Sequence, residues 1–137
     1  MDIVTQLHFY NLYLILIASL VAGVWGLVLF FAKKPFLRSW RNLLIVTGAL
    51  ALLQGILGVT LLLMGKKPDA GVGLYYLHYV YGGIVALALP VALTYATSGK
   101  NPRRDILIFS LAALVLFAAG FRAWMTGPGY WPSWQPS

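Results

Sequence analysis

The chain contains two histidines, and each stands near the start of a long apolar run. His8 lies in LHFYNLY and His78 lies in YLHYVYGG, so aromatic rather than charged residues surround both rings. A neutral imidazole is a common metal ligand and also forms hydrogen bonds. Cysteine is absent, so any metal must be held by histidine, methionine or oxygen ligands. Without nearby carboxylates, two histidines supply too few ligands for a zinc or copper site.

The composition of the chain indicates a membrane protein. Of its 137 residues, 61% are hydrophobic and 9% are charged, whereas soluble domains carry about 25% charged residues. The first apolar run is too long for the core of a signal peptide, so we interpret it as a transmembrane helix. We predict an all-α membrane protein with a single four-helix domain over residues 1–126 and an aromatic interfacial tail over residues 127–137. Four stretches have the length and composition of spans: about 7–32, 43–64, 72–97 and 106–125.

Basic residues between the spans predict the orientation of the chain in the lipid bilayer. Seven of them follow the first and third spans: Lys33, Lys34, Arg38, Arg41, Lys100, Arg103 and Arg104. The loop after the second span has only two. Because positive charges favour the cytoplasmic side, both termini are predicted on the periplasmic or extracellular face of a bacterial plasma membrane. The net charge of +7 is thus explained by topology, and we do not expect nucleic-acid binding.

Short loops between the spans predict an up-and-down bundle of antiparallel helices. In such a bundle the first and third helices run in the same direction and face each other across the core. His8 precedes Lys33 by 25 residues and His78 precedes Lys100 by 22 residues. At about 1.5 Å of rise per residue, these distances differ by only about 4.5 Å, which helix tilt can absorb. Both rings are therefore predicted to lie at one depth, in the outer leaflet.

Small residues recur at helical spacing in the first span, where they include Ser19, Ala22, Gly23 and Gly26. A similar stripe of small residues follows in the second span. In lipid, such stripes let helix backbones approach closely. We interpret them as packing surfaces.

Two imidazoles that face each other at one depth could be the axial ligands of a haem. Gly82 lies one helical turn after His78, and its missing side chain would leave room for a flat macrocycle. The sequence therefore predicts a non-covalent haem b held by His8 and His78. An alternative is that both histidines are interfacial side chains that contact headgroups or a neighbouring helix.

Arg122 lies near the outer end of the fourth span, in AAGFRAW. An arginine within a span is costly and needs a partner. Haem propionates could accept a charge-assisted, bidentate contact from its guanidinium. The alternative is that Arg122 extends to the lipid headgroups.

The segment LLQGILGVTLLL, followed by YLHYVYGGIVALAL, resembles one four-helix half of heme A synthase. In that family a helix with the pattern Q-x-x-L-G and a polar turn precede a helix headed by a haem-ligand histidine. Gln54, Leu57 and Gly58 fill the first pattern here, and His78 is at the position of the histidine. The resemblance covers roughly residues 5–97. It implies a bundle that holds haem near its outer face, with His8 and His78 as the axial pair.

The chain differs from that family in ways that affect the expected chemistry. The family's enzymes have two fused four-helix halves and four histidines. They carry a glutamate one turn before the first histidine and an arginine directly after it, where this chain has Thr5 and Phe9. A haem with both axial positions filled also has no open site for oxygen. The resemblance therefore implies haem binding and electron transfer rather than hydroxylation.

Together these patterns predict a small membrane cytochrome b-type subunit that relays electrons, docked to a larger respiratory or photosynthetic complex. Quinone is a candidate partner, although no residue indicates it. Haem attached through thioethers is excluded because the chain has no Cys-x-x-Cys-His. Two alternatives stay open: a homodimeric, heme A synthase-like enzyme and a haem-free structural subunit of a membrane complex.

Overall fold

The computed structural model describes residues 3–65 and 75–126, and these residues form four helices without a β-strand. The helices are α1 (Ile3–Phe31), α2 (Arg38–Leu63), α3 (Tyr75–Tyr95) and α4 (Pro102–Thr126). All four are long and apolar enough to cross a membrane. The predicted all-α class with four candidate spans is thus confirmed. The predicted tail over residues 127–137 lies outside the described residues.

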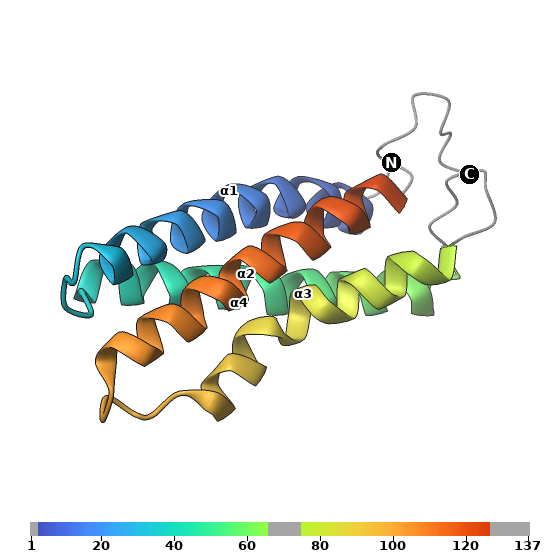
Figure 1. Ribbon diagram of the computed structural model, residues 1–137. Coiled ribbons are helices and arrows are strands. Elements are labelled where there is room, and N and C mark those ends of the chain that lie inside the picture. The colour runs from blue at the N-terminus through green and yellow to red at the C-terminus, as the bar shows by residue number, and fades with distance from the viewer. Residues whose placement is uncertain (1–2, 66–74, 127–137) are drawn as a thin grey trace.

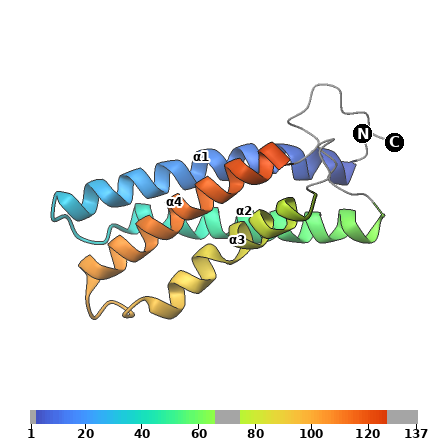
Figure 2. The same ribbon diagram turned by 45° about the vertical axis from the view of Figure 1, so that its right-hand side comes forward.

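The helices run antiparallel in chain order (Figure 1). Helix α1 packs against α2 and α4, and α3 packs against the same two helices, so α1 and α3 lie diagonally across the bundle. Figures 1 and 2 show that α1 and α3 begin at the same end of the bundle, where α2 and α4 finish. We call this end the histidine end. The opposite end, which carries residues 32–41 and 97–104, is called the basic end.

The helix boundaries differ from the predicted spans. Helices α1, α2 and α4 begin four or five residues before the predicted starts of their spans at 7, 43 and 106. The first three residues of the predicted third span, 72–74, lie outside the described residues. The apolar criterion finds the hydrocarbon-spanning part of a helix, whereas polar residues at its ends also form helical hydrogen bonds. At α4 the side chain of Asn101 accepts a hydrogen bond of 3.1 Å from the amide of Arg104. This cap and Pro102 in the first position explain the early start.

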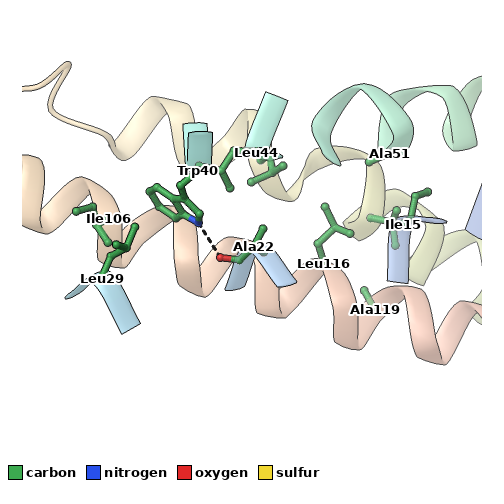
Figure 3. Close-up of a cluster of buried hydrophobic side chains, with 12 residues drawn as sticks. Ile15, Ala22, Leu29, Trp40, Leu44, Ala51, Ile106, Leu116 and Ala119 are labelled. Atoms are coloured by element: carbon green, nitrogen blue, oxygen red, sulfur yellow. Dashed lines mark hydrogen bonds between the residues drawn. The ribbon is translucent and has the colours of Figure 1, made fainter. Parts of the chain in front are cut away.

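Close packing near the basic end is organised around Trp40, which is fully buried. Its indole Nε1 donates a hydrogen bond of 2.8 Å to the carbonyl oxygen of Ala22 on α1 (Figure 3). A Cβ atom at Gly26 would lie 2.5 Å from the Trp40 ring, and one at Gly23 would lie 2.6 Å from the side chain of Leu114. The small residues of α1 are therefore packing positions, as predicted.

Three buried hydroxyl groups satisfy their hydrogen bonds within their own helices. The hydroxyl groups of Ser19, Thr47 and Ser110 each donate to a carbonyl oxygen four residues earlier, over 2.6–2.8 Å. Large apolar side chains are exposed on the outside of all four helices. A surface of this kind suits hydrocarbon rather than water, because contiguous exposed apolar area marks contact with a membrane or a partner. The protein is thus suited to a lipid bilayer.

Candidate functional site

The bundle brings the two histidines together at the histidine end. His8 lies near the start of α1 and His78 near the start of α3. Their ring centres are 6.1 Å apart and their planes meet at 64°. Both side chains are half-buried. The two rings thus lie close together at one end of the bundle, while their depth in the outer leaflet and the binding of a cofactor stay predictions.

His78 is oriented by a contact with α4. Its ring Nδ1 lies 2.9 Å from the carbonyl oxygen of Ala123. A carbonyl oxygen only accepts hydrogen bonds, so Nδ1 carries the proton of this contact and Nε2 keeps its lone pair. A histidine that binds a metal through one nitrogen usually donates the other N–H to such an oxygen. This contact therefore fixes the tautomer and the orientation of the His78 ring.

His8 is anchored through its backbone rather than its ring. Gln54 on α2 donates a hydrogen bond of 2.8 Å from Nε2 to the carbonyl oxygen of His8. The ring Nδ1 is buried and has no hydrogen-bond partner among the described residues. A Cβ atom at Gly58 would lie 3.4 Å from Cε1 of the His8 ring. The ring thus faces the part of α2 that has no side chain.

A buried pair of amides connects α1 and α2 beside His8. Asn11 donates from Nδ2 to the side-chain oxygen of Gln54 over 2.9 Å and to the carbonyl oxygen of Leu50 over 3.0 Å. Both amide side chains are buried. Hydrogen bonds between helices help to hold them together in lipid. The Asn11–Gln54 pair therefore fixes α1 against α2 next to the histidine pair.

The space beside the histidines is uneven along the bundle. Gly82 lies on the same face of α3 as His78, and a Cβ atom there would meet no heavy atom of the described residues within 4 Å. The same is true of Gly83. Deeper in the bundle, a Cβ atom at Gly120 would lie 3.2 Å from Leu16 and 3.7 Å from Val85. No described side chain therefore covers α3 at Gly82 and Gly83, whereas the interior at Gly120 is closely packed.

Arg122 lies at the histidine end, where its side chain is close to Tyr81 and Met125. Its side chain is exposed, with the guanidinium carbon 5.6 Å from the centre of the Tyr81 ring and Nη1 3.9 Å from Sδ of Met125. The next residue, Ala123, supplies the carbonyl group that contacts His78. Arg122 thus projects from the helix that orients His78, and its predicted role toward a propionate stays a prediction.

Two features of the site were not predicted from the sequence: the role of Asn11 and the carbonyl contact of His78. Asn11 could have been found, because a polar amide within an apolar span is rare and usually has a partner. The contact with Ala123 carries no signal in the sequence, because it uses a backbone oxygen and depends on how α3 and α4 are rotated. Gln54 was singled out only by resemblance, without its contact to His8.

The described residues contain no group of three or more His, Cys, Asp or Glu side chains that could hold a metal ion. The two histidines are thus the candidate metal ligands that this part of the chain places together. No protein-family model, curated protein or solved structure matches the chain. On its geometry alone, the bundle brings two imidazole rings, a residue type that commonly binds metals, within 6.1 Å of each other.

Proposed function

We propose that this protein is a membrane cytochrome b-type subunit that holds one non-covalent haem b between His8 and His78 and relays electrons. The observation that carries this proposal is the 6.1 Å separation of the ring centres. Metal–imidazole bonds of about 2 Å on both sides, with roughly 1 Å from each ligating nitrogen to its ring centre, place two axial rings roughly 6 Å apart. The histidines thus already have the spacing of an axial pair.

Three further features support the same site. The contact with Ala123 leaves Nε2 of His78 free of its proton, as an axial ligand requires. Gly82 leaves open space on the same helix face. The resemblance to heme A synthase assigns the ligand role to the same two histidines. Haem bound here would supply one-electron chemistry, while the chain would set its orientation and potential.

The proposal includes the surroundings of the site. Arg122 would pair with a haem propionate, since its exposed guanidinium lies on the helix that contacts His78. The excess of basic residues at the basic end supports an outer-leaflet site, with both termini periplasmic or extracellular. A four-helix subunit of this kind would pass electrons within a larger respiratory or photosynthetic complex, with quinone as a candidate partner.

Two other functions are consistent with particular observations. A haem-free structural subunit would need only the close helix packing at Gly23 and Gly26 and the apolar outer surface. In that case the edge-on contact of the two histidine rings would be a helix-packing contact. A homodimeric, heme A synthase-like enzyme would need a haem with one open coordination position in addition to the bis-histidine haem.

A reduced-minus-oxidised visible spectrum of the purified protein, loaded with haem, tests the proposal. We expect sharp low-spin b-type bands that disappear in both His8→Ala and His78→Ala. Tyr10→Phe is the matched control, because Tyr10 is an exposed neighbour of His8 on the same helix, and it should keep the bands. A folded wild-type protein that takes up no haem would overturn the proposal in favour of a structural subunit. Oxygen-dependent turnover would instead favour the synthase-like enzyme.

A further inference from the structure

The two imidazoles are held in unequal ways. The ring of His78 is fixed by the contact between its Nδ1 and the carbonyl oxygen of Ala123. The ring of His8 has no such contact: its buried Nδ1 finds no hydrogen-bond partner within residues 3–65 and 75–126. The contact from Gln54 reaches only the backbone of His8. The Nδ1 atom of one ring is therefore held by a hydrogen bond, whereas the Nδ1 atom of the other is not.

This difference affects how firmly each ring can bind a metal. A hydrogen bond from the second ring nitrogen fixes the tautomer and raises the basicity of the ligating nitrogen. Loss of such a partner typically weakens metal binding by about 10- to 100-fold. His78 has this partner and His8 does not, so His78 is the stronger of the two ligands.

The His8 ring packs against α2 at Gly58, where an added Cβ atom would lie 3.4 Å from Cε1. This contact involves no hydrogen bond to the ring Nδ1. The two rings are thus unequal in the hydrogen bonds that set their basicity.

We infer that His78 is the permanent axial ligand and His8 the exchangeable one, so that the reduced haem site opens on the His8 side to a small neutral molecule such as carbon monoxide. This inference rests on the proposed function. It adds binding of a diatomic gas to electron transfer. The site would then respond to such a gas by losing its low-spin, bis-histidine state.

The test is a carbon monoxide titration of the reduced, haem-loaded protein, followed by the Soret band. We expect the wild type to form the carbon monoxide complex, and His8→Ala to do so with at least about tenfold higher affinity, because no side chain competes. His78→Ala should lose most of its haem during purification, which the ratio of Soret to protein absorbance measures. Tyr10→Phe should behave as the wild type. Far-ultraviolet circular dichroism confirms that each variant is helical.

The outcomes separate this inference from the function on which it rests. A wild type with low-spin bands that stays unchanged under saturating carbon monoxide would overturn the inference and leave the bis-histidine haem in place. Equal haem retention and equal gas affinity in the two histidine variants would overturn it as well. If His78→Ala does not fold, the inference is tested by comparing the wild type with His8→Ala. A His8→Ala protein that has lost its haem would show that His8 is not the exchangeable ligand. A wild type without low-spin bands overturns both proposals.

Discussion

At the scale of single residues, the space beside His78 depends on one missing side chain. Gly82→Leu would place four carbon atoms where an added Cβ atom meets nothing within 4 Å among the described residues. We expect the haem-to-protein absorbance ratio to fall several-fold while the helix content stays the same, because the new side chain competes only with the cofactor. Gly83→Leu is the matched control, since this neighbouring position is also open but lies on the exposed side of α3. Unchanged haem content in Gly82→Leu would show that no macrocycle lies on this face.

The residues of the site were predictable to the extent that their position depends on distance along a helix. That His8 and His78 lie together at one end of the bundle followed from counting residues to the basic loops, because helical rise is constant. The partners of these residues were not predictable in this way. The contact of His78 with Ala123 and the Asn11–Gln54 pair depend on the rotation of each helix about its axis. That rotation is determined by side-chain packing between helices rather than by apolar composition.

At the scale of helices, the approach of α1 to its neighbours depends on Gly26. A Cβ atom at this position would lie 2.5 Å from the buried ring of Trp40 and would also clash with the side chain of Ser110. We expect Gly26→Ala to lower the free energy of unfolding by about 1–3 kcal/mol, the usual cost of overpacking a core. Titration with sodium dodecyl sulfate, followed by circular dichroism, measures this change.

The control for this prediction is Gly48→Ala on α2. A Cβ atom at Gly48 would lie 3.6 Å from Cδ1 of Leu89, which is an ordinary contact. This variant should therefore unfold at nearly the same concentration of detergent as the wild type. If both substitutions lower the free energy of unfolding equally, the clash of the added methyl group at Gly26 is not the cause.

The loop between α3 and α4 shows why helix ends are harder to predict than helix existence. The buried carboxylate of Asp105 accepts hydrogen bonds from the amide and hydroxyl groups of Thr97 and from the amide of Gly99. These contacts fasten the end of α3 to the first turn of α4. Apolar composition predicts the hydrocarbon-spanning part of each helix, whereas its ends depend on such local polar contacts.

At the scale of the whole molecule, the fold combines an apolar exterior with an uneven distribution of charge. Helix α3 is the least covered by the rest of the bundle. In its most apolar stretch of 18 residues, 17% of the residues are buried, compared with 39% in the corresponding stretch of α4. Both histidines and Arg122 lie at the histidine end, while seven basic residues gather in and beside the two connections at the basic end. The bundle therefore has two chemically different ends, and its orientation decides which side of the membrane the histidine pair serves.

This orientation can be tested with two cysteine variants in a chain that has no cysteine of its own. Ser39 and Met64 are both exposed and lie at opposite ends of α2, Ser39 at the basic end and Met64 at the histidine end. Because positive charge is retained on the cytoplasmic side, a membrane-impermeant maleimide added to intact cells should label Met64→Cys and leave Ser39→Cys unlabelled. Permeabilised cells are the control, in which both variants should be labelled. The reverse pattern in intact cells would place the histidine pair at the cytoplasmic face, and the electron partner would then have to reach it from that side.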